Sequence, residues 1–388
     1  MILLSYSEIG LKKDNRYYFE KRLLDNIRSK TKEADLKNII NLHKKYLLDY
    51  ENEDLAISLL QNIFGIHKIR KCKIFDLEDR ESFERNLLKD IENKRASRKI
   101  KTFGVTTKRI NKRYPQTSMD FSKDIGSLIY EYFGDLQVDL KNPDLWVYCE
   151  IEKKFLIYYI DEFDGLGGLP VGTGGKALLL LSGGIDSPVA GFLMQKRGVI
   201  LEVIHFHSPP YTSEQLKIKI EKIAKQLAYF QNNKIKLYFV DIAKYLRLIN
   251  KYGNRDYNVL HQRRLMMKVA EKIAVEYNLD ALITGDNLGQ VASQTIKNIL
   301  AVNSIINKTI IFRPLIAYEK NDIIKLSKKI GIYDISIEPL EDCCTLFVPK
   351  HPVTKANVNI IEDFEEKIDF DSIVDEIYNL REEKIVKI

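Results

Sequence analysis

The residues from Ala177 to Pro188 constrain the fold of this chain more than any other part of its sequence. Five consecutive apolar residues, 177–181, have the pattern of a buried strand, and the residues SGGIDS (182–187) follow before Pro188 opens an amphipathic helix. Two glycines let backbone N–H groups approach an anion, the serines add hydroxyl donors, and the helix directs its positive end at the same point. The stretch predicts a phosphate-binding turn between a strand and a helix.

Asp186 restricts the chemistry of this turn. Its carboxylate would repel phosphate unless a divalent cation lay between them, so the sequence predicts Mg²⁺ held by Asp186 and a pyrophosphate. The turn lacks the Gly-Lys-Ser/Thr triplet that closes a Walker A loop. Transfer of the γ-phosphoryl group is therefore disfavoured.

The pattern of apolar residues divides the chain into two halves. After residue 176 strand and helix patterns alternate, which is typical of a doubly wound parallel sheet, whereas the first half has the mixed order of α+β domains. The elements expected in the first half are strands 1–6, 39–50, 101–107, 146–151 and 155–159, helices 16–30, 81–96 and 118–133, and a helix that opens near Asp54. Those expected in the second half include strands 199–206, 235–241, 281–284 and 310–314 and helices 213–231, 258–277, 290–300 and 320–330. We expect domains at 1–60, 61–164 and 177–388, with a Gly-rich linker at 165–176.

Polar residues gather where the expected strands of the second half end. One strand ends in His-Phe-His (205–207), and another runs into Thr-Gly-Asp-Asn (284–287). Ligands bind at the carboxyl ends of strands in such sheets, so these residues are candidates for nucleotide contact. A helix between them carries Arg263 and Arg264, and a guanidinium there would neutralise charge on a transferring phosphate. His205 and His207 could instead be hydrogen-bonded core residues, which is the commoner case for lone histidines.

The distribution of charge points to a polyanion. The net charge is +7, and residues 91–123 hold ten Lys or Arg against two acidic residues. This run fits either a surface that faces nucleic acid or a solvated basic face. Apolar runs are short and interrupted, and the N-terminus does not resemble a signal peptide, so we expect a cytoplasmic protein without contact to a membrane.

Several stretches resemble known proteins. The SGGIDS turn resembles the PP-loop of the adenine nucleotide α-hydrolase superfamily, whose members cleave ATP between the α and β phosphates. Together with HFHSPPYTS, TGDNLGQVASQT and CCTLFVPKHPVTK, it resembles the ThiI family of tRNA 4-thiouridine synthetases. The start, SEIGLKKDNRYYFEKRL, resembles the ferredoxin-like domain of that family, and FGVTTKRINKRYPQTSMDFSKDIGSLI and VDLKNPDLWVYCEI resemble its tRNA-binding THUMP domain. The resemblance favours an RNA surface for the basic run, with Lys108, Arg109, Lys112 and Arg113 as phosphate contacts.

The resemblance also implies a reaction. Uridine at position 8 of tRNA is adenylated with ATP and Mg²⁺, and a persulfide supplied by a cysteine desulfurase then delivers sulfur and releases AMP. Asp186 is the principal catalytic candidate, and Cys344 fits the cysteine of the sulfur step better than its neighbour Cys343. The implied ATP-site residues are Leu180, Leu181, Ser182, Gly183, Gly184, Ile185, Ser187, His205, Phe206, Arg263, Gly285 and Gln294. A homodimer, in which one subunit holds the tRNA that the other modifies, is a further expectation.

The source of sulfur stays open at this point. Longer family members carry a rhodanese-like domain, and the stretch after residue 352 is expected to be too short for one. Sulfur would then come from a separate carrier protein, from free sulfide, or from a persulfide on Cys343 or Cys344; an iron–sulfur cluster and a role of both thiols as core residues are alternatives. A part in thiamine synthesis is also open.

Two other functions fit parts of the sequence. One is another PP-loop enzyme that modifies tRNA, of the lysidine or 2-thiouridine type, but the THUMP-like half argues against it because those enzymes lack it in the family pattern. The other is a non-catalytic RNA-binding adaptor. An intact SGGIDS turn argues against that function.

Overall fold

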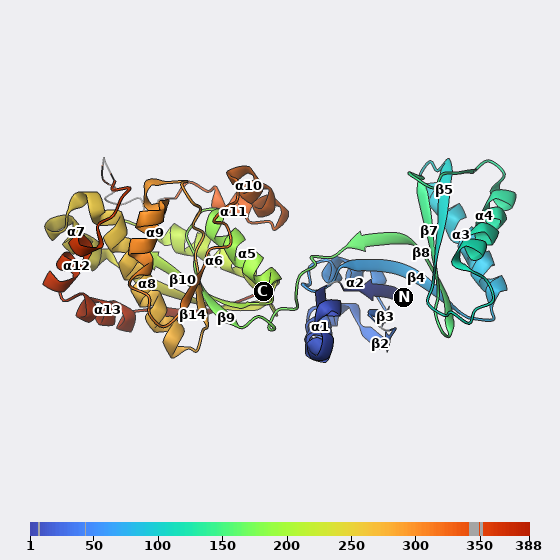
Figure 1. Ribbon diagram of the computed structural model, residues 1–388, viewed down its shortest axis with the longest axis horizontal. Coiled ribbons are helices and arrows are strands. Elements are labelled where there is room, and N and C mark those ends of the chain that lie inside the picture. The colour runs from blue at the N-terminus through green and yellow to red at the C-terminus, as the bar shows by residue number, and fades with distance from the viewer. Residues whose placement is uncertain (7, 43, 341–348, 350–351) are drawn as a thin grey trace. The chain divides into compact units, whose positions relative to one another are not determined.

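A computed structural model describes all residues of the chain except 7, 43, 341–348 and 350–351. The chain divides into two compact units (Figure 1). The first holds residues 1–13 and 27–167, and the second holds 14–26 and 168–388. Among the described residues, no helix is long and apolar enough to cross a membrane.

The first unit is built on one eight-stranded sheet with the strand order β2-β3-β1-β4-β8-β7-β5-β6. Its first module consists of β1 (Ile2–Ser5), β2 (Leu36–Asn41), β3 (Lys45–Tyr50), α2 (Glu53–Leu60) and β4 (Lys68–Asp76). Its second module consists of α3 (Arg80–Ser97), β5 (Thr102–Arg109), α4 (Ser118–Phe133), β6 (Gln137–Val138), β7 (Leu145–Ile151) and β8 (Phe155–Asp164). Strands β4 and β8 pair antiparallel from Lys68 opposite Asp164 to Asp76 opposite Phe155, so the sheet is continuous across both modules.

Two expectations for this unit were wrong in detail. The single strand expected at 39–50 is the hairpin β2–β3, because the chain turns at Lys44, whose φ of 71° is incompatible with an extended strand. Strand β4 was not expected at all, since a register shift between Lys71 and Cys72 interrupts its alternation of polar and apolar residues. By contrast α4 has the expected bounds. Its ends are set by Thr117, whose side chain accepts a hydrogen bond from the backbone N–H of Asp120, and by Gly134, which has a φ of 68°.

The second unit contains a six-stranded sheet, and the predicted doubly wound fold is confirmed. The strand order is β13-β12-β9-β10-β11-β14, with β14 antiparallel to β11 and the other neighbours parallel. The strands are β9 (Lys176–Leu180), β10 (Ile200–His207), β11 (Lys234–Asp241), β12 (Ala281–Ile283), β13 (Ile310–Phe312) and β14 (Glu382–Lys387). The chain moves from β9 to β10 on one side and returns to β12 on the other, which makes the carboxyl ends of β9 and β12 a topological switch point.

Helices cover both faces of this sheet. One face is covered by α5 (Asp186–Lys196) and α6 (Glu214–Tyr229), onto which α10 (Lys320–Lys329) and α11 (Tyr333–Ser336) pack. The helices of the other face are α7 (Ala243–Tyr252), α8 (Asn258–Glu276), α9 (Ile296–Asn303), α12 (Val358–Lys367) and α13 (Phe370–Asn379). The helix expected at 290–300 begins only at Ile296, because the side chain of Thr295 accepts a hydrogen bond from the N–H of Asn298 and caps the helix there.

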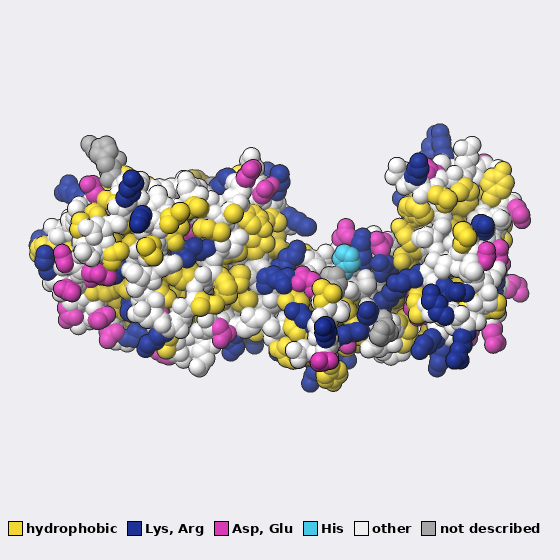
Figure 2. All heavy atoms as spheres, in the orientation of Figure 1, with side chains coloured by type: hydrophobic (Ala, Val, Ile, Leu, Met, Phe, Trp, Pro, Cys, Tyr) yellow, Lys and Arg dark blue, Asp and Glu magenta, His cyan; other side chains and the backbone are white. Residues whose placement is uncertain are grey.

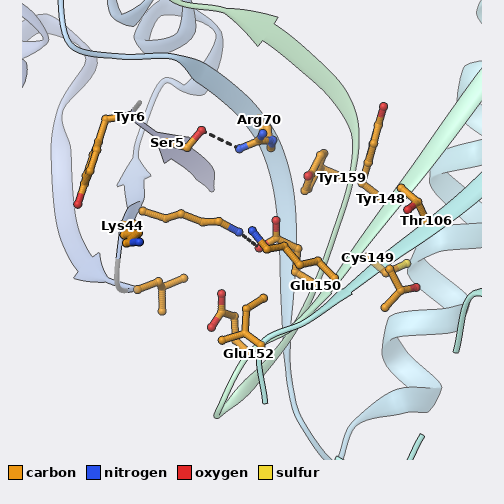
Figure 3. A pocket seen from close by; sticks show the side chains of 15 residues that line it. Ser5, Tyr6, Lys44, Arg70, Thr106, Tyr148, Cys149, Glu150, Glu152 and Tyr159 are labelled. Carbon is orange, nitrogen blue, oxygen red and sulfur yellow. Dashed lines mark hydrogen bonds and ion pairs between the residues drawn. The ribbon is translucent and has the colours of Figure 1, made fainter. Parts of the chain in front are cut away.

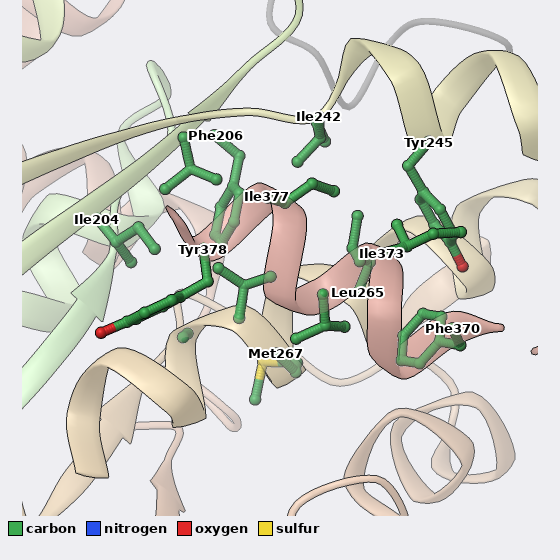
Figure 4. Close-up of a cluster of buried hydrophobic side chains, with 14 of the residues drawn as sticks. Ile204, Phe206, Ile242, Tyr245, Leu265, Met267, Phe370, Ile373, Ile377 and Tyr378 are labelled. Atoms are coloured by element: carbon green, nitrogen blue, oxygen red, sulfur yellow. The ribbon is translucent and has the colours of Figure 1, made fainter. Parts of the chain in front are cut away.

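Helix α13 fills the core between β10, α7 and α8 (Figure 4). Its buried residues recur at helical spacing: Phe370, Ile373, Val374, Ile377 and Tyr378. Each large apolar side chain buried in this way stabilises the fold by about 1.5–3 kcal/mol. Helix α13 therefore completes the core of the six-stranded sheet.

The Gly-rich stretch at 165–176 is bonded to the second unit over part of its length. Helix α1 (Arg16–Lys30) donates hydrogen bonds to it, from Tyr18 to the carbonyl of Gly172 at 3.1 Å and from Asn26 to that of Val171 at 3.1 Å. These bonds explain why residues 14–26 belong to the second unit.

Candidate active site

The predicted phosphate turn joins β9 to α5 and is closed by its two serines. The backbone N–H of Ser182 donates to Oγ of Ser187 at 2.9 Å, and the two hydroxyl oxygens lie 3.0 Å apart. Helix α5 begins at Asp186, so its positive end faces the turn. Pro188 is the third helical residue rather than the first, but it still lies in the first turn, where its missing N–H costs no helical bond.

Gly285 brings the end of β12 against this turn. A Cβ atom at Gly285 would lie 2.7 Å from the backbone N of Ser187 and 2.9 Å from the carbonyl carbon of Asp186. Both contacts are shorter than real Cβ atoms show, and both are to backbone, so neither can be relieved by a side-chain rotation. Glycine is required here because the two strand ends of the switch point touch.

Asp186 lies at the start of α5 and faces α10. Both of its carboxylate oxygens accept hydrogen bonds from the ammonium of Lys320, at 2.6 and 2.9 Å, and the Gln290 amide lies 3.4 Å from one of them. The Asp186 side chain is 26% exposed, so solvent and ligand can reach it. Sequence reasoning missed Lys320, although its place at the first residue of the helix after β13 is a signal that could have found it.

A buried carboxylate organises the next strand end. Asp286, directly after Gly285, pairs with Arg263 at 2.5 Å and with Arg313 at 3.0 Å, and it accepts a hydrogen bond from Thr284 at 2.9 Å. Burial raises the pKa of Asp286, but the charges of Arg263 and Arg313 outweigh that effect and hold this pKa below its usual value. The ionised carboxylate thus fixes two guanidinium groups beside the turn.

Neighbouring arginines on α8 have different roles. Arg263 reaches the strand ends, with Nη1 also 3.5 Å from the Ser293 hydroxyl. Arg264 is buried and forms a bidentate pair with Glu365 of α12, with both bonds at 2.7 Å. Arg263 is therefore placed at the site, whereas Arg264 joins two helices.

The remaining predicted ATP-site residues divide between strand ends and core. The imidazole Nδ1 of His205 lies 2.8 Å from the carbonyl of Leu181, which ties β10 to the start of the turn. The side chain of Phe206 lies on the opposite face of β10 and packs into the core (Figure 4), so only its backbone faces the strand ends. Oε1 of Gln294 is buried and has no hydrogen-bond partner among the described residues. Such an atom fits an amino group of a bound ligand.

The predicted phosphate contacts of the first unit differ from one another. Lys108, Lys112 and Arg113 are exposed. Arg109 is half-buried and donates hydrogen bonds to the carbonyls of Tyr114 at 3.2 Å and Gln116 at 2.8 Å, which shapes the loop after β5. Figure 2 shows Lys and Arg side chains gathered on the second module.

A hollow of about 590 Å³ opens between the two modules of the shared sheet (Figure 3). Its cationic lining residues are Lys44, Lys45, Arg70 and Lys108, and its aromatic ones are Tyr6, Tyr148 and Tyr159. The rings of Tyr148 and Tyr159 are stacked with centroids 5.0 Å apart, and the Arg70 guanidinium lies 5.1 Å from the Tyr159 ring centre. Burial lowers the pKa of Lys45, and its ion pair with Glu150 opposes that shift. Cations and aromatic faces thus meet in one hollow.

Comparison with known proteins places this geometry in a family. The family described as thiamine biosynthesis protein (ThiI) matches residues 172–370, the ThiI ferredoxin-like domain matches 1–69, and the THUMP domain matches 85–161. The chain belongs to the ThiI family. A probable tRNA sulfurtransferase of Caldanaerobacter subterraneus subsp. tengcongensis is 41% identical, with 100% of this chain and 99% of that protein aligned. One of Thermoanaerobacter pseudethanolicus is 40% identical, with the same coverage.

Solved structures agree with the ThiI assignment. A crystal structure of a 4-thiouridine synthetase–RNA complex with bound ATP is 36% identical, has a TM-score of 0.90, and aligns with 100% of this chain and 99% of that one. The structure of PH1313 from Pyrococcus horikoshii, at 23% identity and a TM-score of 0.65, shares the fold. The two N-terminal modules of this ThiI chain are thus the ferredoxin-like and THUMP domains, and the sheet of the second unit carries the PP-loop.

The cysteines of the ThiI chain fall into two groups. Cys343 and Cys344, the candidates for sulfur chemistry, lie outside the described residues. Cys72 and Cys149 are buried in the first unit, and burial raises the pKa of each thiol to about 12. A thiol with such a pKa is protonated at neutral pH and is a poor nucleophile.

Proposed function

We propose that this chain is an ATP-dependent tRNA sulfurtransferase that converts uridine 8 of tRNA to 4-thiouridine. The observation that carries the proposal is the switch point, where the closed turn 182–187, the Asp186–Lys320 pair and the Arg263–Asp286–Arg313 cluster meet. A relative named probable tRNA sulfurtransferase and the ATP-bound 4-thiouridine synthetase each align with this chain over its full length. Their function supports the same reaction here.

The first half-reaction is adenylation. The turn, with the N-terminus of α5 behind it, holds the β,γ-pyrophosphate of ATP and leaves the α-phosphorus open. The C4 oxygen of uridine attacks that phosphorus, pyrophosphate leaves, and AMP becomes bonded to the base. Arg263 and Arg313, held by Asp286, neutralise charge on the phosphates as the bond breaks. The buried Oε1 of Gln294 accepts a hydrogen bond from the adenine amino group.

The donor set around Asp186 fits Mg²⁺. This ion usually takes one or two carboxylates and fills its shell with substrate phosphates and water, and Asp186 is a partly exposed carboxylate at the turn. When bound there, Mg²⁺ would neutralise charge on the pyrophosphate. Lys320, which donates to both oxygens of Asp186, would hold the carboxylate in a fixed orientation at the start of α5.

The second half-reaction is sulfur transfer. The outer sulfur of a persulfide, carried by a cysteine desulfurase or a separate carrier protein, attacks C4 of the adenylated uridine and AMP leaves. The Cys344 thiolate then attacks the carrier sulfur, which breaks the S–S bond, frees 4-thiouridine and leaves a disulfide between Cys344 and the carrier. An external thiol reductant reduces that disulfide and restores both cysteines.

The first unit holds the tRNA in this proposal. Lys108, Lys112 and Arg113 contact phosphates, and the hollow between the modules offers cations beside stacked tyrosines, the combination found in single-stranded RNA sites. The proposed RNA-binding and catalytic residues lie in separate units, which fits a homodimer whose subunits share one tRNA. We place this enzyme in the cytoplasm. Sulfur supply for thiazole formation in thiamine synthesis is a second role, which the description of the matched family favours.

The test uses purified protein, tRNA, ATP, Mg²⁺ and a persulfide donor. We expect tRNA-dependent release of pyrophosphate and AMP, and mass analysis of the nucleosides should show 4-thiouridine; lysidine, 2-thiouridine or ADP would contradict the proposal. Cys344→Ser should release pyrophosphate without forming 4-thiouridine. Full thiolation by Cys344→Ser would remove that residue from the mechanism, and loss only in Cys343→Ser would transfer the role to Cys343.

A further inference from the structure

The buried amide of Asn298 connects the ATP site to a distant part of the chain. Asn298 lies on α9 with 0% of its surface exposed. Its Nδ2 donates to the carbonyl of Ala292 at 2.8 Å and to that of Val353 at 2.7 Å, while its Oδ1 accepts from the N–H of Ala356 at 3.0 Å. Both amide protons and the amide oxygen are therefore used, on one side by the turn that carries Gln294 and on the other by residues 353–356.

Thr295 adds a second bond between the same two segments. Its hydroxyl donates to the carbonyl of Thr354 at 2.7 Å, and the same oxygen accepts from the N–H of Asn298 at 3.3 Å. The cap of α9 and the connection to Thr354 thus share one hydroxyl. The turn 292–294 and residues 353–356 cannot shift independently without breaking these bonds.

Lys219 makes a corresponding connection from the PP-loop. It lies on α6 with 3% of its surface exposed, and its ammonium donates to the carbonyls of Ser336 at 2.8 Å and Glu338 at 2.9 Å. A Cβ atom at Gly183 of the PP-loop would lie 3.6 Å from this ammonium. Burying an ammonium is costly unless its protons are bonded, so these carbonyls are held firmly beside the loop.

The two connections enclose the cysteine pair in the sequence. Ser336 and Glu338 precede Cys343 and Cys344, and Val353 to Ala356 follow them. From this we infer that Lys219 and Asn298 are positioning residues that couple the ATP site to sulfur delivery. The inference rests on the proposed function. The two residues touch neither the reacting base nor sulfur; they act by fixing the chain before and after the cysteine pair to the PP-loop and the Gln294 turn.

The coupling has a measurable consequence, because the adenylated uridine has two fates. Attack by the persulfide sulfur at C4 gives 4-thiouridine and AMP, whereas attack by water at the same carbon restores uridine and releases AMP. If sulfur delivery is displaced, the intermediate either accumulates or is hydrolysed. In both cases pyrophosphate has already been released, so the ratio of pyrophosphate released to 4-thiouridine formed rises.

The experiment measures this ratio for full-length protein with tRNA, ATP, Mg²⁺ and a persulfide donor. The variants are Asn298→Ala, Asn298→Asp, Lys219→Met and Lys219→Arg. We expect the ratio to rise about tenfold in the Ala, Asp and Met variants, as the loss of buried hydrogen bonds predicts. Lys219→Arg keeps a cation and hydrogen-bond donors, so its ratio should lie between that of Lys219→Met and that of the unaltered protein.

Gln195→Ala is the matched control. Gln195 is also an amide with 0% exposure in the same unit, but its Nε2 donates to the Leu227 carbonyl at 2.9 Å and to Oε1 of Gln231 at 3.1 Å, and neither partner belongs to the segments that flank the cysteine pair. A loss of folded protein lowers both products together and leaves the ratio unchanged, as we expect for this control. An unchanged ratio in the Asn298 and Lys219 variants, or an equal rise in Gln195→Ala, overturns the inference. Failure of the unaltered protein to form 4-thiouridine would instead overturn the proposed function.

Discussion

The two units of this chain place their charges in opposite ways. In the first unit Lys108, Lys112 and Arg113 are exposed on a sheet and loop surface. In the second, Asp286 and the side chains that it pairs with are largely buried at the carboxyl ends of parallel strands. Exposed cations attract a polyanion through the sum of many weak interactions, whereas a small nucleotide needs a few groups held at fixed distances. Single substitutions should therefore have large effects in the second unit and small ones in the first.

Asp186→Ala should distinguish the functions of the two units most clearly. Loss of the carboxylate at the turn should lower pyrophosphate release by about 1,000-fold, in the range for removal of a preorganised charged group. Affinity for tRNA should be nearly unchanged, because the proposed phosphate contacts lie in the first unit. Filter binding of labelled tRNA and a pyrophosphate assay measure the two quantities. A comparable loss of tRNA binding would break the comparison.

Buried ion pairs provide the next test, since one from each unit can be compared. Asp286→Asn removes the charge between Arg263 and Arg313 and should lower the free energy of unfolding by about 3 kcal/mol, as expected when one partner of a buried pair is lost. Glu150→Gln removes the partner of Lys45, whose ammonium lies at a hollow that water can enter, so the loss should be about 1 kcal/mol. Urea unfolding measures both; equal losses would show that water in the hollow does not relieve the unpaired charge of Lys45.

Acid should unfold the second unit first. Burial, with a contribution from Lys217, lowers the pKa of His207 to about 4, and burial likewise lowers that of His261 to about 4. The unfolded chain binds these protons near pH 6.5, so stability is lost as pH falls from 6.5 towards 4, by about 2 kcal/mol per histidine at pH 5. Glu152 in the first unit acts in the opposite direction, because burial raises its pKa and the folded state binds its proton more readily.

The chain offers a built-in probe for this difference. Its single tryptophan, Trp146, lies on β7 in the first unit, so its fluorescence reports on that unit, whereas circular dichroism reports on both. On acidification the loss of helical signal should precede the change in Trp146 fluorescence. His261→Leu should move the first transition to lower pH, and coincident transitions in both signals would show that the units do not unfold separately.

One glycine-to-alanine substitution in each unit compares how much space each glycine has around it. A methyl group at Gly285 would collide with the PP-loop backbone, so Gly285→Ala should raise KM for ATP about tenfold, the cost of a modest overpacking strain. Gly126 lies within α4, where a Cβ atom would meet nothing within 4 Å, so Gly126→Ala should stabilise the protein by about 0.5–1 kcal/mol. Kinetics and thermal unfolding distinguish the two outcomes. Normal KM for ATP in Gly285→Ala would show that the turn adapts to the methyl group.

The smallest effect is expected at the RNA surface. Lys112→Gln with Arg113→Gln should reduce the slope of log affinity for tRNA against log salt by about one to two units. Lys367→Gln with Lys387→Gln, two exposed charges of the second unit, is the control for net charge and should leave the slope unaltered. If the slope is unchanged in the variant with Lys112→Gln and Arg113→Gln, these two residues do not contact tRNA.

The sequence alone carried enough information for the parts of this protein that depend on local pattern. The SGGIDS turn between an apolar run and an amphipathic helix, and the bounds of α4, follow from residues close together in the chain, because strand patterns, glycine turns and helix caps are local. Contacts between distant residues had no such signal. The pairing of Lys320 with Asp186 and of Asp286 with two arginines arises only when strands β9, β12 and β13 bring their ends together. The hydrogen bonds of Asn298 with Val353 and Ala356 arise only when the stretch before α12 lies against α9. The tertiary structure decided these contacts, because hydrogen bonds and ion pairs depend on distances of about 3 Å, which the fold creates between residues far apart in the sequence.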